Sequence, residues 1–270
     1  MVATPLGNLG DLSPRAILAL QNAGLILAED TRKSGLLLAG LGIKAKKFSS
    51  LHEHNEEQRI KMAIMKVEQG IDCCLICDAG TPLMADPGYR LVRAFRKKQL
   101  TVIPVPGPCA PVTALMACGI PPYPFTFLGF LPRKPGELDG LFARWKDMPS
   151  TLVFFERKNR VRQTLQKAYD WFGPREYCLA RELTKTYEEF IFGVLGQKDI
   201  PAESLRGEIT IVIGPPDKKP QKTSEDQIQS LIRSYSCQNL KPRKTASLIS
   251  RKASGWSSRD IYDLIIKSEP

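Results

Sequence analysis

Four short segments place acids, glycines and prolines directly after apolar runs of strand type: Thr4–Asp11, Glu29–Arg32, Asp78–Gly88 and Pro106–Ala110. Open parallel sheets bind ligands at the edge where the carboxyl ends of their strands meet. Glycine lets a ligand approach the main chain closely, and proline stiffens a loop. Each segment alone could be an ordinary strand-to-helix connection, but four of them at one sheet edge predict a ligand cleft.

Two further segments carry side chains capable of chemistry. Ala180–Lys185 brings an arginine, a glutamate and a lysine to a predicted strand end, which suits either an anionic substrate or a solvated turn with a surface ion pair. Leu51–Glu56 contains His52 and His54, which would share one face of an extended segment. A metal would need a third ligand from the acids, so we favour polar contacts near the cleft, with proton transfer by a histidine as an alternative.

The cysteines and glycine patterns argue against several other kinds of site. Cys74 and Cys77 have the spacing of a redox or zinc half-site, but no second pair follows at metal spacing. We interpret them as buried thiols in a core strand of a reduced, cytoplasmic protein that binds no metal. No Gly-x-x-x-x-Gly-Lys-Ser/Thr loop is present, and Gly40-x-Gly42 lacks the third glycine of a dinucleotide fingerprint.

The elements that must position these segments alternate between strand and helix in the first half, which predicts an α/β fold with a largely parallel sheet. After a joint at Ile120–Pro124 the last strands follow one another without a helix between them, which predicts a mixed α+β half. We place domains at residues 1–119, 120–216 and 222–270. The expected strands are Val2–Ala3, Leu25–Ala28, Cys73–Cys77, Val102–Val105, Phe125–Leu128, Thr151–Phe155, Tyr177–Ala180, Glu188–Val194 and Glu208–Ile213. The expected helices are Ser13–Leu20, one capped by Asn55 with Gln58 in a capping box, Tyr89–Lys98, Val112–Cys118, Arg160–Phe172, Asp226–Tyr235, Pro242–Ala253 and Ser258–Lys267.

Length, composition and net charge indicate what kind of protein this is and what kind of partner it binds. With 270 residues, 43% apolar and 25% charged, the chain is long enough for two domains and has no apolar run near the roughly 20 residues of a membrane span. Met1–Pro5 lacks the features of a signal peptide and resembles the tail of a strand whose natural start lies upstream. The net charge of +11 points to a polyanion, nucleic acid before membrane, with a generally basic proteome as the bland alternative. Residues 218–270 hold eleven Lys and Arg against five acids.

These segments together resemble a known family, the bacterial small-subunit ribosomal RNA 2′-O-ribose methyltransferases that modify a cytidine in the decoding region. That family is a branch of the tetrapyrrole methylase superfamily, the class III S-adenosylmethionine-dependent methyltransferases. The similar stretches are VATPLGNLGD (2–11), AEDTR (28–32), HEHNE (52–56), DAGTPLMADPGYR (78–90), PGPCA (106–110), GFLP (129–132), ARELTK (180–185) and the pair Gly207-Glu208. The basic tail is similar to the small helical domain that ends these enzymes.

The resemblance implies two α/β domains with the cofactor S-adenosyl-L-methionine in the cleft between them, a small C-terminal helical domain and a homodimer in the cytoplasm. By this analogy the cofactor-binding residues are Pro5, Gly7, Asp78, Ala79, Gly80, Thr81, Pro82, Leu83, Pro106, Gly107, Pro108, Cys109, Ala110, Phe155, Glu156 and Ala180. The residues expected to bind small-subunit ribosomal RNA are Arg32, His52, His54, Arg181, Lys241, Arg243, Lys244, Arg251 and Lys252. The sequence departs from the family at Cys109, where serine is usual, and at Arg157-Lys158-Asn159, which replaces the usual Pro-His.

Methyl transfer to a ribose hydroxyl needs alignment with the donor carbon and a base or cation that activates the hydroxyl. Glu29, Asp30, Glu182 and Lys185 are candidates, and we prefer Lys185 and Glu182 as catalytic residues. A tetrapyrrole methyltransferase is the alternative enzyme, although it leaves the basic tail and ARELTK unexplained. A non-catalytic RNA-binding assembly factor is the alternative of another class, against which the intact DAGTP loop argues.

Overall fold

A computed structural model describes residues 1–44, 47–52, 55–197, 207–216, 223–236, 240–250, 253 and 256–268. The chain divides into two compact units, Met1–Pro215 and Pro216–Pro270. The larger unit contains two sheets, and the domain boundary that we placed at residue 119 within it stays a prediction.

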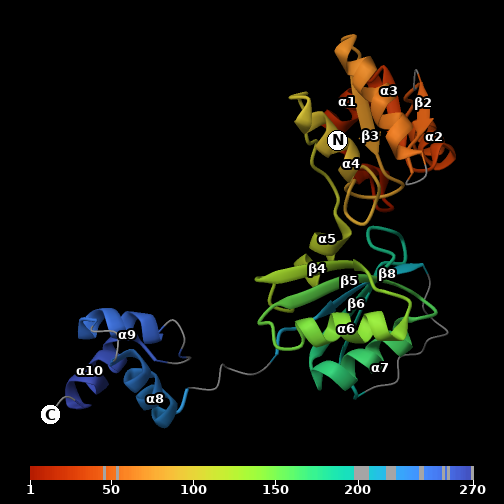
Figure 1. Cartoon of the computed structure of the whole chain (residues 1–270). Coiled ribbons are helices and arrows are strands. Elements are labelled where there is room, and N and C mark those ends of the chain that lie inside the picture. Colours follow the sequence, from red (N-terminus) through yellow and green to blue (C-terminus); the bar gives the residue numbers. More distant parts are fainter. Residues whose placement is uncertain are drawn as a thin grey trace. The chain divides into compact units, whose positions relative to one another are not determined.

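The first sheet has three parallel strands in the order β2-β1-β3, which confirms the parallel arrangement expected for this half (Figure 1). All four residues of β1 are buried, because alternate side chains face helices on opposite sides of the sheet. Ile26 packs with Leu20 and Leu38, whereas Leu27 packs with Ile64 and Leu91. The elements of this half are η1 (Leu9–Asp11), α1 (Pro14–Asn22), β1 (Leu25–Ala28), α2 (Thr31–Gly40), β2 (Phe48–Ser50), α3 (Glu56–Glu68), β3 (Cys73–Ile76), α4 (Tyr89–Lys97) and α5 (Ala110–Ala117).

Three local expectations for this half were wrong or incomplete. Of the expected strand Val102–Val105, only Val105 pairs, in a single parallel bridge with Val2, because the prolines on both sides of it cannot donate to a ladder. Asn55 precedes α3 but makes no capping bond; its Oδ1 accepts from the backbone N of His52 instead. Helix α2 was not expected, since two glycines interrupt its sequence.

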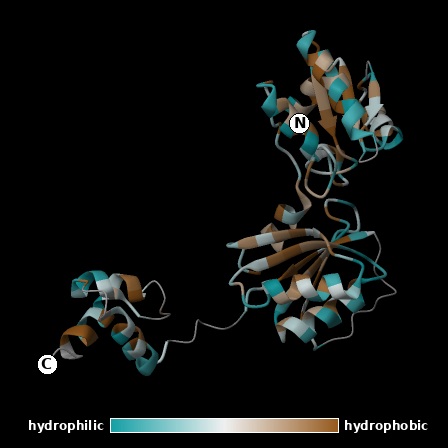
Figure 2. Ribbon diagram, viewed as in Figure 1, coloured by the Kyte–Doolittle hydropathy of each residue, from teal (hydrophilic) through white to brown (hydrophobic). Residues whose placement is uncertain are grey.

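The second sheet has five strands in the order β4-β5-β8-β6-β7, of which only β4 and β5 are parallel, so this half is mixed as predicted. Helices α6 and α7 cover one face, and α5 lies on the other (Figure 1). The strands between these layers are strongly apolar (Figure 2). The elements are β4 (Phe125–Phe130), α6 (Pro135–Trp145), β5 (Thr151–Arg157), α7 (Val161–Phe172), β6 (Glu176–Arg181), β7 (Glu189–Val194) and β8 (Glu208–Ile213).

The smaller unit is helical, and the three predicted helices are present as α8 (Glu225–Ser236), α9 (Pro242–Ser250) and α10 (Ser258–Ser268). Ile228, Ile249 and Ile261 are fully buried where these helices pack together. Within the described part of the chain, every helix is too short or too polar to cross a membrane.

Candidate active site

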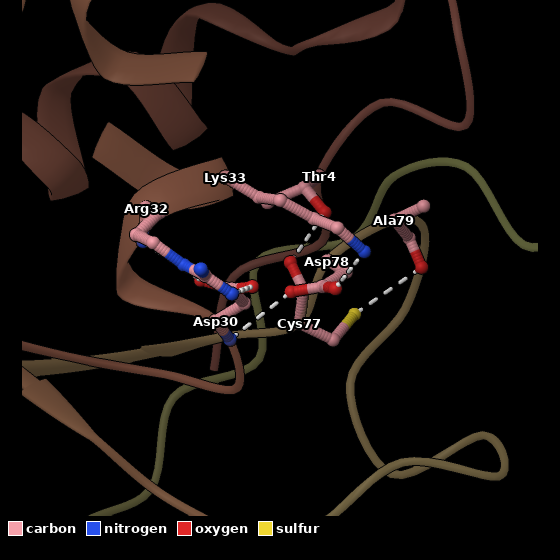
Figure 3. Close-up of polar contacts among 7 residues, drawn as sticks. All are labelled: Thr4, Asp30, Arg32, Lys33, Cys77, Asp78 and Ala79. Atoms are coloured by element: carbon pink, nitrogen blue, oxygen red, sulfur yellow. Dashed lines mark hydrogen bonds and ion pairs between the residues drawn. The ribbon is translucent and has the colours of Figure 1, made fainter. Parts of the chain in front are cut away.

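The loops that follow the strands of the first sheet are joined to one another by hydrogen bonds. The backbone groups of Thr4 and Gly80 bond in both directions at 2.8 and 3.0 Å, and the Thr81 hydroxyl donates to the carbonyl of Pro108 at 2.8 Å. Asp78 accepts from the backbone N of Asp30 at 3.1 Å and from Lys33 Nζ at 2.6 Å (Figure 3). The predicted convergence of the four loops is therefore confirmed.

Three of these loops, those that begin at Thr4, Asp78 and Pro106, form one side of a cavity of about 250 Å³. The carboxyl ends of β4, β5 and β6 and the amino end of the antiparallel strand β8 form the other side. The loop that begins at Asp78 has an unusual backbone course, because it turns through positive φ at Gly80, Leu83 and Ala85. A Cβ at Gly80 would lie 3.0 Å from Leu6 Cδ2, so only glycine fits without displacing that side chain. The lining residues are Leu6, Ala79, Gly80, Thr81, Met84, Asp86, Cys109, Ala110, Pro111, Phe130, Phe155, Ala180, Glu182, Leu183, Lys185, Glu208 and Thr210.

Strand register explains which residues of the second sheet reach the cavity. Phe130 pairs with Phe155, Phe155 pairs with Thr210, and Thr210 pairs with Ala180. These four residues therefore form a row across β4, β5, β8 and β6, and all four line the cavity. Successive side chains of a strand point to opposite faces, so the neighbours of this row face α6 and α7.

Glu156, which we expected at the cofactor, lies on that opposite face. It is 1% exposed, and its carboxylate accepts from the Arg157 backbone N at 2.9 Å and from the Thr164 hydroxyl at 2.7 Å. Arg160 Nη1 lies 3.4 Å from it. Because Phe155 and Glu156 are adjacent on β5, only one of them can face the cavity, and Phe155 does.

The Ala180–Lys185 segment meets the first loop at the cavity. The backbone N of Asn8 donates to the Thr184 hydroxyl at 3.1 Å. The Lys185 stem lies against Gly7, where a Cβ would come within 2.2 Å of Lys185 Cγ. Lys185 Nζ lies 3.2 Å from Glu182 Oε1, so a cation and a carboxylate lie together in the cavity wall.

Three carboxyl groups in the first loops, those of Glu29, Asp30 and Asp86, have shifted pKa values. Burial raises the pKa of Glu29, and the charges of Asp86 and Asp78 raise it further. Burial also raises the pKa of Asp86. Asp30 differs, because hydrogen bonds from Arg32 lower its pKa to about 2. Asp30 is the N-cap of α2, which accounts for its position without a catalytic role.

Asp86→Asn is expected to stabilise the protein more at pH 7 than at pH 4. A raised pKa means that the folded state binds the proton more tightly, so stability falls as pH rises from the ordinary carboxyl range to the raised value. Asparagine cannot ionise and removes that loss, an advantage of a few tenths to about 1 kcal/mol at pH 7. Urea unfolding at both pH values measures it.

Asp139→Asn is the control with the opposite sign, because hydrogen bonds from Trp171 and Lys167 lower the pKa of Asp139. That variant is expected to lose stability relative to the parent as pH rises. An Asp86→Asn advantage that is equal at pH 4 and pH 7 would contradict the argument.

The structure brings half of the expected catalytic and cofactor-binding residues to the cavity. Both catalytic candidates, Lys185 and Glu182, line it. The expected cofactor residues that also line it are Ala79, Gly80, Thr81, Cys109, Ala110, Phe155 and Ala180. Those outside the lining are Pro5, Gly7, Asp78, Pro82, Leu83, Pro106, Gly107, Pro108 and Glu156.

Sequence reasoning did not single out Asp86, Phe130, Glu208 and Thr210, which also line the cavity. Three of them had a signal, since Asp86 lies in DAGTPLMADPGYR, Phe130 in GFLP and Glu208 in the Gly-Glu pair, all of which carried the resemblance. Thr210 could have been found from Glu208, because residues two apart on a strand share a face.

The residues expected to bind RNA lie in different places. Arg32, at the start of α2, pairs with Asp30 at 2.9 Å. Arg181, at the end of β6 in the second sheet, pairs with Glu189 of β7. His52 is exposed and close to Asn55. In the smaller unit Lys241, Arg243 and Lys244 are exposed at the start of α9. His54, Arg251 and Lys252 lie outside the described residues.

The cysteines and the possible metal ligands do not form a second site within the described residues. Cys74, Cys77 and Cys118 are buried, and Cys73 is partly buried. Burial raises the pKa of Cys73 to about 11. No group of three or more His, Cys, Asp or Glu in the described part of the chain is arranged to hold a metal ion.

Comparison with known proteins identifies the class. The model of the family described as tetrapyrrole (corrin/porphyrin) methylases matches residues 1–199, so the chain belongs to this family and is a methyltransferase. Two solved structures have the same fold. The methyltransferase CobJ aligns with a TM-score of 0.61 and 17% identity over 79% of this chain and 92% of that one. CbiF, a cobalt precorrin-4 methyltransferase, aligns with a TM-score of 0.58 and 15% identity over the same shares.

Closer relatives extend over almost the whole chain. The ribosomal RNA small subunit methyltransferase I of Pasteurella multocida is 39% identical over 97% of this chain and 94% of its own length. The protein of the same name from Escherichia coli O157:H7 is 37% identical over 100% of this chain and 94% of its own. The resemblance expected from the sequence is confirmed.

Proposed function

We propose that this protein transfers a methyl group from S-adenosyl-L-methionine to the 2′-hydroxyl of a cytidine in the decoding region of small-subunit ribosomal RNA. The observation that carries the proposal is the extent of the likeness. The solved structures of CobJ and CbiF each cover 79% of the chain, a share that matches the size of the Met1–Pro215 unit. The ribosomal RNA methyltransferases of Pasteurella multocida and Escherichia coli O157:H7 match 97% and 100% of the chain, so these matches include the basic helical unit.

The cavity suits the proposed cofactor. S-adenosyl-L-methionine supplies an electrophilic methyl group when bound. Gly80 lines the cavity without a side chain, which lets a ligand approach the main chain closely, and Thr81 and Cys109 border the same space. The lining carries three carboxylates, Asp86, Glu182 and Glu208, against the single ammonium of Lys185, so the cavity wall favours a cation despite the basic chain.

Lys185 and Glu182 are the residues that would act on the acceptor. A ribose hydroxyl is a weak nucleophile until its proton is removed. The Glu182 carboxylate can accept that proton, and the Lys185 ammonium can stabilise the negative charge that develops on the oxygen. Their separation of 3.2 Å lets one hydroxyl group contact both.

The smaller unit would hold the RNA by its phosphates. Replacing Lys241, Arg243 and Lys244 together by glutamine is expected to weaken RNA binding and reduce its salt dependence. Each lost contact to a single-stranded phosphate lowers the slope of log K against log salt by about 0.7, so the three together lower it by about 2. Filter binding between 50 and 300 mM salt measures the slope.

A matched variant separates this effect from a general loss of charge. It replaces three exposed lysines of the larger unit by glutamine, one in α3, one at the end of α4 and one directly after α4. The slope of log K against log salt for this variant should stay within experimental error of the parent. Equal slopes for both triple variants would show that the tail is not the RNA contact. The control positions are Lys61, Lys97 and Lys98.

The proposed function is tested by incubating the full chain with radiolabelled S-adenosyl-L-methionine and small ribosomal subunits that lack the modification. The expected result is one methyl group per subunit, mapped to the ribose of a single cytidine in the decoding region. Label on a base, label at another position, or no transfer despite cofactor binding would each contradict the proposal. We also propose a cytoplasmic homodimer, which sedimentation equilibrium tests.

A further inference from the structure

Phe130 is a large apolar side chain that remains 43% exposed although it lines the cavity. Its ring packs against that of Phe155, with centroids 5.3 Å apart and planes inclined by 57°. Phe155 in turn packs edge-on against Phe127 at 5.0 Å. The Phe130 ring is thus supported by an aromatic cluster while much of its surface stays open.

The backbone around Phe130 is shaped to place this ring. The pairing of β4 with β5 shifts between Phe127, which pairs with Val153, and Phe130, which pairs with Phe155. Three residues of β4 therefore span two of β5, which is a bulge, and Gly129 within it has φ +65°. Bulges of this kind redirect a side chain at the end of a strand.

An ion pair between the partly buried Arg160 and the buried Glu156 restrains the chain just beyond the ring. Arg160 donates to the carbonyls of Leu131 at 3.3 Å and Pro132 at 2.7 Å. The same guanidinium lies 3.4 Å from the Glu156 carboxylate, which Thr164 also holds. Charge-assisted bonds to two successive carbonyls restrain the backbone that carries Phe130.

Polar groups line the same cavity. Thr210 lies directly opposite Phe155 on β8, and Glu208 lies two residues earlier on the same face of that strand. A carboxylate accepts hydrogen bonds from exocyclic amino groups, and a threonine hydroxyl can donate or accept. An open aromatic ring with acceptors nearby suits a planar heteroaromatic ring that bears an amino group.

We propose that Phe130 is a stacking platform for the amino-bearing heteroaromatic ring of a ligand, with Arg160 as its positioning residue. This rests on the proposed function, which offers two rings of this chemistry: the adenine of the cofactor and the base of the target cytidine. A base can stack on residue 130 only if that side chain has a flat aromatic ring, whereas any apolar side chain of similar size could fill the space.

Phe130→Leu keeps an apolar side chain and removes the ring, and Phe130→Tyr keeps the ring as the matched control. Calorimetric titration with S-adenosylhomocysteine reports on adenine, and the concentration of ribosomal subunits that gives half the single-turnover rate reports on the target base. We expect Phe130→Leu to weaken one of the two by about tenfold and Phe130→Tyr to stay within twofold of the parent. A weaker affinity for S-adenosylhomocysteine would identify adenine as the stacked ring, and a higher half-saturating concentration of subunits would identify the target base.

Arg160→Met should shift the same quantity as Phe130→Leu, and the double variant should lose little more than either single one. Unchanged values for Phe130→Leu in both measurements would overturn the proposal, as would equal losses for leucine and tyrosine. Additive losses in the double variant would remove Arg160 from the positioning role. If the parent protein itself binds no S-adenosylhomocysteine and transfers no methyl group, the proposed function fails instead.

Discussion

Replacing Lys185 by methionine is expected to lower the single-turnover rate of methyl transfer by at least about 100-fold. Methionine keeps an unbranched apolar stem against Gly7 but removes the ammonium 3.2 Å from Glu182. The charge that develops on the acceptor oxygen then loses its nearest cation within the described cavity wall. Affinity for S-adenosylhomocysteine should change less than threefold, so the loss appears in the rate at saturating cofactor.

Lys98→Met is the matched control, because Lys98 forms an ion pair with Glu68 at 3.0 Å on the surface, away from the cavity. It should retain the parent rate. Glu182→Gln should resemble Lys185→Met, since the two residues act on one hydroxyl. Gly7→Ala gives an independent route to the same defect, because its Cβ would displace the Lys185 stem. Parent rates in both Lys185→Met and Glu182→Gln would remove this pair from the chemistry.

Replacing Glu156 by alanine is expected to lower the free energy of unfolding of the larger unit by about 3 kcal/mol. The carboxylate is 1% exposed and joins β5 to α7 through Thr164 and Arg160. Its removal leaves the buried Thr164 hydroxyl without its acceptor and the largely buried Arg160 guanidinium without its counter-charge. Urea unfolding followed by the fluorescence of Trp145 and Trp171, which pack on this core, measures the change.

Glu176→Ala is the control for this loss, since Glu176 is an exposed residue of β6 in the same sheet. Its effect should stay within about 0.5 kcal/mol. If Glu156→Ala left stability unchanged and abolished cofactor binding, Glu156 would be a direct ligand contact after all, and its assignment to the opposite face of the sheet would be wrong.

Much of the architecture could be predicted because local patterns decide it. Leu25–Ala28 is a short apolar run without alternation, and a strand buried on both faces needs that composition. The strands of the second half and helix α7 also agree with their patterns to within a few residues, whereas α6 was not predicted. The convergence of the loops followed from parallel topology alone, because parallel strands end at one edge.

The positions that could not be predicted depend on tertiary register. Nothing local separates Phe155 from Glu156, and a shift of one residue would exchange the two faces of the strand. Asn55 lies in a capping sequence, but its side-chain amide donates to the carbonyl of Ser50 at the end of β2 and does not cap α3. Asp86 belongs to the segment that anchors the resemblance, yet its place in the cavity depends on how the loop turns through positive φ at Ala85.

The cavity draws on segments from Leu6 to Thr210, so its parts are separated by some two hundred positions along the chain. A nascent polypeptide cannot assemble it until β8 has left the ribosome and paired between β5 and β6. Non-local pairing of this kind forms slowly. Occupancy by a ligand is consequently linked to folding of the entire Met1–Pro215 unit, and it raises the melting temperature of that unit as a whole.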